Sequence, residues 1–575
     1  MRKQTKVVAV ASAAALLAIG ASMTSFAATG WVEEDGQWYF YDKDGNRVED
    51  EWKKSGDNWY WLDSEEGGAM AVDKLVEDDD DTYYVDGNGV MVTNTWVKVV
   101  NEDQDDDDDP AEYHYYYMQS NGKAYKGDGT SVSKKTIDGK RYAFDEDGVM
   151  LYGWVTESGA MANGEDEWSA SDVKYYFGGW EDGSMKTGWQ KITVHDNEDG
   201  KDDDYDYWFN FKSNGHRRFH DKADATWKSN SRYYHFDERG VMVYQWFETA
   251  TANSASASNW AYFSSPEDGA RVTKGWFKVV APTEDNSFLE SDVTFAKKDS
   301  DDESERWYYS DSKDNGLVIG EIKKIKGKYY GFWPDDGQKG GRMLVGLCAL
   351  QMNEADGSKI DKVVMDDMDS DDLDDFMDTY GTKSQEETGI YLYYFGDGED
   401  GSMKTGSVSL NLDGDSYQFQ FKKTGAADSR GRGVNGVDDG KYIYKYGQKV
   451  KADTDDKYTL VYANGNINDS NVVVEDFDNS DIKGIAKTFD LAAKKGSDED
   501  NLRGYYGFGT AQEGWYLVNT SGRIQTGTKS GTKDGYDMYW FMYKDNIKFY
   551  ADDKNISDYD ELKGDGWHSY FDNLK

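Results

Sequence analysis

The chain has 575 residues and so many more acidic than basic side chains that its formal net charge is −46. A field of this sign repels phosphate backbones and argues against nucleic acid as a partner. Hydrophobic residues make up only 37% of the chain, but aromatic residues make up 15%. Disordered acidic chains are poor in aromatic residues, so the composition predicts folded aromatic modules separated by acidic stretches.

The first 27 residues have the pattern of an export signal. Basic residues precede an apolar run over 7–19, and the small residues Ser25 and Ala27 occupy the two positions that a signal peptidase reads. We expect cleavage after Ala27. No later stretch approaches the roughly 18 apolar residues that cross a bilayer, so no membrane span is expected.

An internal repeat follows directly. It consists of Gly-Trp, a short strand, a turn, an aromatic triplet, an Asp-Gly turn, and Met or Val; the first copy spans 29–45. The octapeptide at 181–188 returns unchanged at 399–406. Alternating rings and polar residues around such turns predict β-hairpins, which are marginal alone but bury their rings when stacked. The expected fold class is therefore all-β: a solenoid of stacked hairpin repeats with long acidic hairpin tips and one short helix.

The repeats change in character along the chain. We expect simple repeats over 28–130, three-hairpin superunits over 131–435, and degenerate repeats over 436–575. One hairpin type recurs at Tyr142, Tyr233 and Tyr329 and marks the start of each superunit. The short helix is expected at 480–496, where apolar residues recur at helical spacing between a serine and a glycine; these residues are Ile482, Ile485, Ala486, Phe489, Ala492 and Ala493.

Four acidic runs occupy one position of the repeat, between the Gly-Trp strand and the aromatic triplet. They cover 101–109, 195–204, 281–305, and the stretch after Leu350 that reaches Asp372. We interpret them as elongated, solvated hairpin tips. Specific calcium binding is the less favoured alternative, because calcium loops need alternating ligands, a glycine bend and a closing glutamate. The sequence indicates no metal site and no cofactor.

The phrase Gly30-Trp31, Gly36-Gln37-Trp38 and Asp44-Gly45 resembles the cell-wall-binding repeat of choline-binding proteins. That repeat is similar to the glucan-binding repeats of streptococcal glucosyltransferases and to the receptor-binding repeats of clostridial toxins. The resemblance covers nearly the whole chain after the signal, strongly to about Trp276 and weakly after about residue 430. It implies a hairpin solenoid whose ligand sites lie between consecutive hairpins.

In the choline-binding family, each ligand cage takes the Gly-Trp ring and the first ring of the triplet from one repeat and an aromatic ring from the next. Carried onto this sequence, the resemblance implies five sets of ligand-binding residues: Trp31, Trp38 and Tyr60; Trp52, Trp59 and Tyr84; Trp189 with Tyr207; Trp246 with Trp260; and Trp276 with Trp307. At other junctions an aliphatic residue replaces the first ring and predicts packing only; these are Leu75, Ile137, Ile322, Leu347 and Val408.

Rings and charge together favour a neutral or cation-bearing polymer as the ligand. Aromatic cages hold quaternary ammonium by cation–π attraction, and the negative field concentrates cations. The leading hypothesis is a secreted, noncatalytic surface protein that is retained noncovalently at the cell wall by a choline-bearing polymer. A glucan-binding adhesin and an acidic scaffold for cationic proteins are the alternatives. No nucleophile, base and acid share a recognisable motif, so no catalytic residue is assigned, and the sequence leaves the oligomeric state open.

Overall fold

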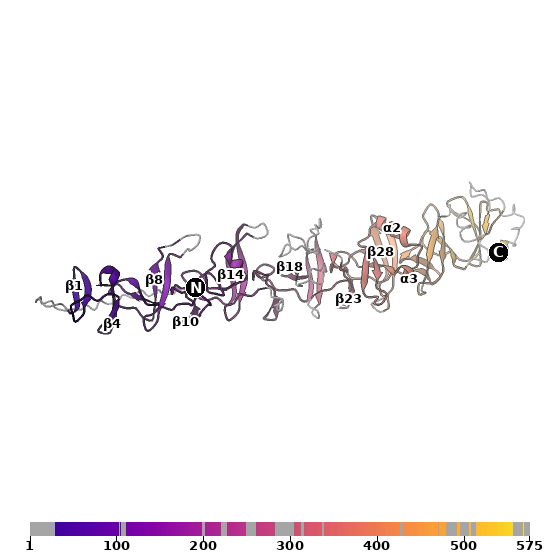
Figure 1. Cartoon of the computed structure of the whole chain (residues 1–575). Helices are drawn as coiled ribbons and strands as arrows, with labels where there is room; N and C mark the ends of the chain where they lie inside the picture. Colours follow the sequence, from indigo (N-terminus) through magenta and orange to yellow (C-terminus); the bar gives the residue numbers. More distant parts are fainter. Residues whose placement is uncertain are drawn as a thin grey trace. The chain divides into compact units, whose positions relative to one another are not determined.

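The structure is a computed structural model of the chain (Figure 1), and it describes fifteen stretches of it. These are residues 29–102, 104, 111–197, 202–219, 227–248, 260–281, 304–311, 316–335, 339–425, 429–469, 471–478, 492–494, 505–507, 513–555 and 567–568. The chain divides into two compact units. Unit 1 contains residues 1–244 and 264–270, and unit 2 contains residues 245–263 and 271–575.

Unit 1 consists of short strands, together with single turns of 3-10 helix at Ser64–Glu66 and Glu167–Ser169. The strands are β1 (Gly30–Glu34), β2 (Gln37–Tyr41), β3 (Glu51–Ser55), β4 (Asn58–Asp63), β5 (Ala69–Met70), β6 (Lys74–Asp78), β7 (Asp81–Val85), β8 (Thr95–Val100), β9 (Tyr113–Met118), β10 (Lys135–Ile137), β11 (Lys140–Tyr142), β12 (Trp154–Thr156), β13 (Val173–Tyr176), β14 (Gly188–Asp196), β15 (Asp203–Phe211), β16 (Trp227–Ser229) and β17 (Arg232–Tyr234).

The described residues of unit 2 form the remaining strands and the helices α2 (Ser370–Tyr380) and α3 (Gln385–Thr388). Its strands are β18 (Gln245–Glu248), β19 (Trp260–Phe263), β20 (Gly275–Val280), β21 (Glu305–Asp311), β22 (Gly316–Leu317), β23 (Ile322–Ile325), β24 (Lys328–Gly331), β25 (Leu347–Met352), β26 (Ile360–Met365), β27 (Ile390–Tyr394), β28 (Gly406–Leu412), β29 (Asp415–Phe421), β30 (Gly436–Asp438), β31 (Tyr442–Lys445), β32 (Gln448–Lys449), β33 (Tyr458–Ala463), β34 (Val474–Phe477), β35 (Ala492–Lys494), β36 (Tyr505–Gly507), β37 (Trp515–Asn519), β38 (Lys529–Lys533), β39 (Tyr539–Tyr543) and β40 (Asn546–Ala551).

Most of these strands pair as antiparallel hairpins, so the all-β prediction is confirmed. Tight turns set the pairing. In the turn between β10 and β11, Asp138 has φ 48° and Gly139 has φ 83°, and Lys326 and Gly327 repeat this pattern between β23 and β24. Two successive positive φ angles are the signature of the type I′ turn, whose twist matches that of the strands it joins.

Within each unit, backbone hydrogen bonds join several of the hairpins to the one before. In unit 1 the amide of Met91 donates to the Trp59 carbonyl (2.9 Å), and the amide of Met242 donates to the Trp208 carbonyl (2.8 Å). In unit 2 the amide of Met343 donates to the Trp307 carbonyl (2.8 Å). In each case the residue that follows an Asp-x-x-Gly or similar turn contacts the preceding hairpin at the same register. The continuous solenoid remains a prediction beyond these local contacts.

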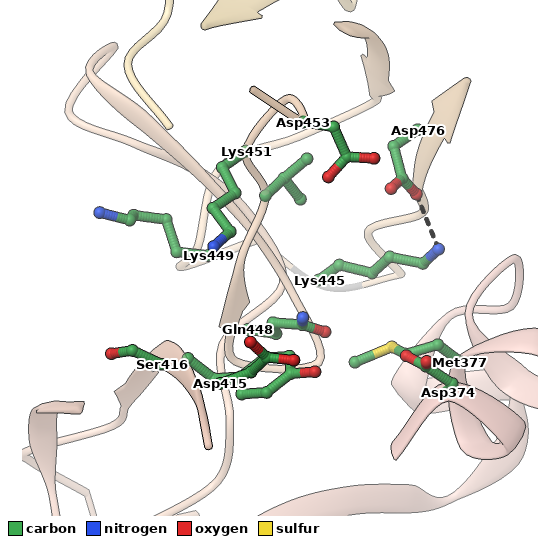
Figure 2. Close-up of a pocket in the computed structure, with 12 residues that line it drawn as sticks. Asp374, Met377, Asp415, Ser416, Lys445, Gln448, Lys449, Lys451, Asp453 and Asp476 are labelled. Carbon is green, nitrogen blue, oxygen red and sulfur yellow. Dashed lines mark hydrogen bonds and ion pairs between the residues drawn. The ribbon is translucent and has the colours of Figure 1, made fainter. Parts of the chain in front are cut away.

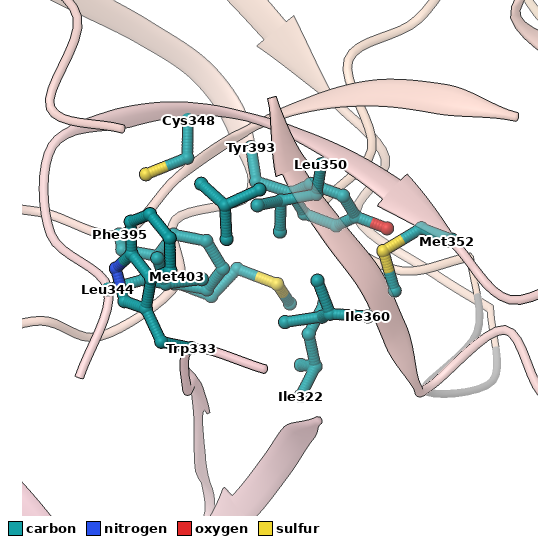
Figure 3. Close-up of a cluster of buried hydrophobic side chains, with 11 residues drawn as sticks. Ile322, Trp333, Leu344, Cys348, Leu350, Met352, Ile360, Tyr393, Phe395 and Met403 are labelled. Atoms are coloured by element: carbon teal, nitrogen blue, oxygen red, sulfur yellow. The ribbon is translucent and has the colours of Figure 1, made fainter. Parts of the chain in front are cut away.

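The core is not aromatic throughout, in contrast to the expectation from composition. Unit 2 contains a largely aliphatic cluster that includes Ile322, Leu344, Leu350 and Ile360 (Figure 3). Cys348 on β25 belongs to it and is fully buried, and burial raises the pKa of its thiol. Two of the aliphatic replacements predicted from the sequence, Ile322 and Leu347, are buried as expected of packing residues.

The fourth acidic run is not a solvated loop. After Leu350 the chain forms the hairpin of β25 and β26 and then the helix α2. Asp369 caps this helix by accepting a hydrogen bond from the Asp372 amide (2.9 Å), and Leu373 and Phe376 bury one face. Acidic residues stabilise the first turn of a helix because they face its positive dipole end, which is why this acidic segment folds.

The helix expected at 480–496 is wrong where it can be compared. Residues 492–494 form β35, which pairs with β36, and the rest of the predicted helix lies outside the described residues. Strand pairing across a sheet outweighs the high intrinsic helix propensity of the alanines and lysines in this stretch. Of the other acidic runs, 195–204 extends the strands of β14 and β15 to the pair Asp196 and Asp203, whereas most of 101–109 and 281–305 lies outside the described residues.

The contact between hairpins generates a prediction about two glycines with the same backbone conformation. Gly240 (φ 82°) lies against the preceding hairpin, and a Cβ there would be 2.7 Å from the Arg218 carbonyl oxygen, whereas Gly139 (φ 83°) has open space around it. We expect Gly139→Ala to lower the free energy of unfolding by about 1 kcal/mol from strain alone. Gly240→Ala should cost about 3 kcal/mol, because the backbone oxygen must also move. Urea denaturation measures both, and equal losses would contradict the tight contact.

Candidate functional site: aromatic cages between hairpins

One aromatic contact recurs between consecutive hairpins. The tryptophan that opens a hairpin meets the edge of a tyrosine on the next hairpin, in a T-shaped arrangement. In unit 1 the ring centroids are 4.8 Å apart for Trp96 and Tyr142 and 5.0 Å apart for Trp189 and Tyr234. In unit 2 they are 4.8 Å apart for Trp276 and Tyr330. Such edge-to-face pairs add about 0.5 to 1.5 kcal/mol beyond the burial of their area.

The first predicted set is brought together at this junction. Trp31 on β1 lies 5.3 Å from Tyr60 on β4 of the next hairpin, in a T-shaped pair. Trp38 lies on the same face as Trp31, because the β1–β2 register pairs Trp31 with Phe40 and Glu33 with Trp38. The structure therefore brings Trp31 and Tyr60 together at this junction and places Trp38 on the same face of its hairpin.

The second predicted set needs one correction. Trp52 contacts Tyr83 at 5.0 Å and not Tyr84, whose hydroxyl donates to the Asp73 carboxylate. Adjacent residues of a strand point to opposite faces, so only one of these two tyrosines can face the preceding hairpin. Trp59 lies on the same face as Trp52, since Trp52 pairs with Trp61, and it is 40% exposed. This junction consists of Trp52, Trp59 and Tyr83.

The predicted pairing of Trp189 with Tyr207 is also wrong by one residue of the strand. Trp208 is the ring on the face of Trp189, with centroids 6.3 Å apart at an interplanar angle of 85°. The β14–β15 register pairs Lys191 with Trp208 and Ile192 with Tyr207, so Tyr207 points to the other face. There it is buried and donates its hydroxyl hydrogen to the Asp196 carboxylate (2.5 Å).

The two sets of unit 2 differ in accessibility. Trp246 and Trp260 are each only 1% exposed and belong to a buried cluster with Tyr308, so they form core and not an accessible cage. Trp276 and Trp307 are brought together, with centroids 6.2 Å apart and ring planes perpendicular. Both are half-buried, and Tyr330 of the next hairpin completes the junction.

Sequence reasoning missed the junction of Trp96 with Tyr142. Threonine precedes Trp96, so the Gly-Trp signal is absent there. A sequence pattern around the partner tyrosine could have found this junction, because Tyr142, Tyr234 and Tyr330 all precede a phenylalanine by two residues. The ring centroids of those phenylalanines lie 5.7 to 5.9 Å from those of the respective tryptophans.

One junction already holds a cation that belongs to the chain. The guanidinium carbon of Arg217 lies 4.9 Å from the Trp154 ring centroid and 4.5 Å from that of Phe219. Its terminal nitrogens donate to the backbone carbonyls of Trp168, Ala170 and Val173 at 2.7 to 3.2 Å. Burial lowers the pKa of the guanidinium to about 9, so it stays charged at neutral pH. This junction is closed by the protein itself.

A different kind of site lies in unit 2, where a pocket of about 410 Å³ is lined by charged side chains (Figure 2). Lys445 points toward Asp476, with which it forms an ion pair (2.8 Å). The other charged lining residues are Asp374, Asp415, Lys449, Lys451 and Asp453. Tyr417 is the only aromatic residue of the lining, so this pocket does not have the geometry of the cages. None of the helices in the described part of the chain is long and apolar enough to cross a membrane.

The fold and the junctions define a class of protein, an all-β chain of aromatic hairpin repeats whose rings meet at the contacts between repeats. Within it, residues 28–74 match the family profile of the choline-binding repeat, so the resemblance seen in the sequence is confirmed for that stretch. That stretch contains the junction of Trp31, Trp38 and Tyr60. A comparison with curated proteins found no match.

Solved structures with some likeness come from Streptococcus pneumoniae. The choline-binding domain of CbpL is 23% identical, with 38% of this chain and 88% of that chain covered and a TM-score of 0.23. Choline-binding protein F is 16% identical, with coverages of 74% and 100% and a TM-score of 0.22. The modular autolysin LytC, in complex with a synthetic peptidoglycan ligand, is 16% identical with a TM-score of 0.28, and this chain spans 57% of its length. TM-scores this low carry no conclusion about how the repeats are arranged.

The filled junction generates a prediction about stability. Arg217→Ala removes the buried cation and takes one donor from each of three backbone carbonyls, of which Ala170 O still accepts from the Val173 amide. We therefore expect the free energy of unfolding to fall by about 3 kcal/mol. The control is Arg47→Ala, because Arg47 lies over Tyr39 at 3.9 Å but is exposed. It should cost less than about 1 kcal/mol. Urea denaturation followed by tryptophan fluorescence measures both, and similar costs would contradict a structural role for the buried cation.

Proposed function

We propose that this protein is a noncatalytic surface protein that binds a choline-bearing cell-wall polymer through the cages between its hairpins. The observation that carries the proposal is the recurring junction in which a tryptophan, a second ring of its own hairpin and a tyrosine of the next hairpin converge. Rings that meet edge to face present π faces around a common space, and this is the geometry that recognises quaternary ammonium groups.

The proposed binding residues differ from the sequence prediction where the structure corrects it. Tyr83 replaces Tyr84, Trp208 with Tyr234 replaces Tyr207, and Tyr330 joins Trp276 and Trp307. The proposed cages are Trp31, Trp38 and Tyr60; Trp52, Trp59 and Tyr83; Trp96, Tyr115 and Tyr142; Trp189, Trp208 and Tyr234; and Trp276, Trp307 and Tyr330.

The charge of the chain and the junction that holds Arg217 support a cationic ligand. There the Arg217 guanidinium lies against the rings of Trp154 and Phe219. A net charge of −46 raises the local concentration of cations and repels bare phosphate polymers. Each cation–π contact contributes about 0.5 to 2 kcal/mol, so a single cage binds weakly. Several weak cages on one chain gain avidity on a polymer that carries many choline groups.

This binding would hold the exported protein at the cell wall without a covalent link. The export signal at 1–27 stays a prediction, because those residues lie outside the described part of the chain. A neutral glucan is the second candidate ligand, and the exposed face of Trp59 favours it, because a sugar ring could stack on that indole. The two ligands differ in charge, which makes them separable in one experiment.

We expect the full mature chain to be retained on choline-loaded resin and eluted by free choline. Trp52→Ala and Tyr83→Ala should weaken retention, because each removes a wall of one cage, whereas Tyr84→Ala should not, because that ring faces away. The loss should be modest, about 1 kcal/mol for one cage among several.

Pull-down by insoluble α-glucan runs in parallel as the contrasting measurement. Capture by glucan without retention on choline would replace the proposal with the glucan-binding function. Binding that added salt abolishes and that neither choline nor sugar competes would assign the protein to the acidic scaffolds instead.

A further inference from the structure

Two of the cages carry a carboxylate at their rim that belongs to a distant turn. In unit 1 the turn that contains Glu267 reaches back to the hairpin of β14 and β15. Lys191 Nζ lies 2.9 Å from Glu267 Oε1, and the Trp208 indole Nε1–H donates to Glu267 Oε2 (3.1 Å). Trp208 is a wall of the Trp189 cage, so this carboxylate lies beside the ligand space.

The same arrangement recurs independently in unit 2. Lys278 Nζ lies 2.9 Å from Glu399 Oε1, and Lys278 pairs across the hairpin with Trp307, as Lys191 does with Trp208. The Trp307 indole is directed at the same carboxylate, and its hydrogen bonding contributes to the lowered pKa of Glu399. Glu399 belongs to the octapeptide 399–406.

The neighbouring aspartate holds each turn in place. Asp268 forms an ion pair with Arg232 on β17, and Asp400 forms one with Lys328 on β24 (3.1 Å). Arg232 and Lys328 each precede the cage tyrosine, Tyr234 or Tyr330, by two residues. The Glu-Asp pair thus spans both hairpins that form the cage: the aspartate is fixed to the one that supplies the tyrosine, and the glutamate to the one that supplies the tryptophans.

Both glutamates are ionised and accessible. Hydrogen bonding from Lys191 lowers the pKa of Glu267, and that from Lys278 lowers the pKa of Glu399. The side chains are 66% and 74% exposed, so a ligand can approach them without unfolding the turn. A carboxylate next to an aromatic cage attracts a cation, whereas it gives a neutral ligand of the same shape no such gain.

We propose that Glu267 and Glu399 are specificity-determining residues that make their two cages select a quaternary ammonium ligand over a neutral ligand of the same shape. This inference rests on the proposed function and adds to it the source of charge selectivity. Lys191 and Lys278 act in the opposite direction, because each partly neutralises its glutamate and competes with the ligand cation for it. A bound quaternary ammonium group therefore replaces the lysine as the cation next to the carboxylate, and the affinity for the ligand depends on this competition.

The test uses the full mature chain labelled with 5-fluorotryptophan, so that fluorine NMR reports each cage separately. The signals of the two cages are assigned with Trp189→Phe and Trp276→Phe. Choline and its uncharged isostere 3,3-dimethylbutan-1-ol are titrated into each variant. Glu267→Gln keeps the acceptor for the Trp208 indole and removes only the charge.

We expect Glu267→Gln to weaken choline binding at the Trp189 cage by about three- to tenfold and to leave isostere binding unchanged within about twofold. Lys191→Met should strengthen choline binding there by about threefold, because it frees the carboxylate. The Trp276 cage, unaltered in both variants, is the internal control. Glu399→Gln and Lys278→Met should give the same opposed effects at the Trp276 cage.

A purely structural ion pair predicts a different result, in which both variants weaken choline and isostere alike, and that result would overturn the inference. An unchanged preference for choline in Glu267→Gln and Glu399→Gln would overturn it as well, while leaving the proposed function in place. Failure of the unaltered protein to bind choline in any cage would overturn both.

Discussion

The contact of a tryptophan with the tyrosine edge of the next hairpin is the interaction on which the rest of the structure depends. An isolated two-stranded hairpin is marginal in water, because it leaves one face of its rings uncovered. Here the following repeat covers that face, as Tyr234 covers Trp189. The hydrogen bond that the Met242 amide donates to the Trp208 carbonyl fixes the register of the two hairpins. The contact that stabilises the repeat is therefore also the contact that forms the cage.

Occupancy by a cation separates the junctions into two kinds. Where Arg217 enters the ring cluster around Trp154, three carbonyl acceptors and burial make the cation a permanent part of the fold. Where no side chain enters so deeply, the rings remain half-buried, as at Trp276 and Trp307. There Glu399 lies beside the hairpin of Trp276 and Trp307 through its ion pair with Lys278. Under the proposal, such carboxylates add a local attraction for cations to the long-range field of an acidic chain.

In part of unit 2, the contacts between hairpins are made by aliphatic side chains and not by aromatic rings. Aliphatic residues such as Ile322 and Leu347 take the place of tryptophan, and they are buried in clusters with Cys348, Leu373 and Phe376. An aliphatic side chain has no π face, so those junctions gain burial and lose the capacity to hold a cation. The helix α2, which an acidic sequence alone did not suggest, covers one of these clusters through Leu373 and Phe376.

The sequence by itself determined the hairpins, their all-β class and the identity of the rings, because alternation and type I′ turn residues act locally. It also predicted that Trp31 and Tyr60 come together, where the repeat is most regular. Only the tertiary structure decided which of two adjacent rings faces the next hairpin: Tyr83 and Trp208 do, and Tyr84 and Tyr207 do not. In a run of consecutive aromatic residues, rings point to both faces, and the pairing register alone selects one set. The contact of Glu267 with Lys191 could not be predicted from the sequence either, because it joins a hairpin to a turn 76 residues further along the chain.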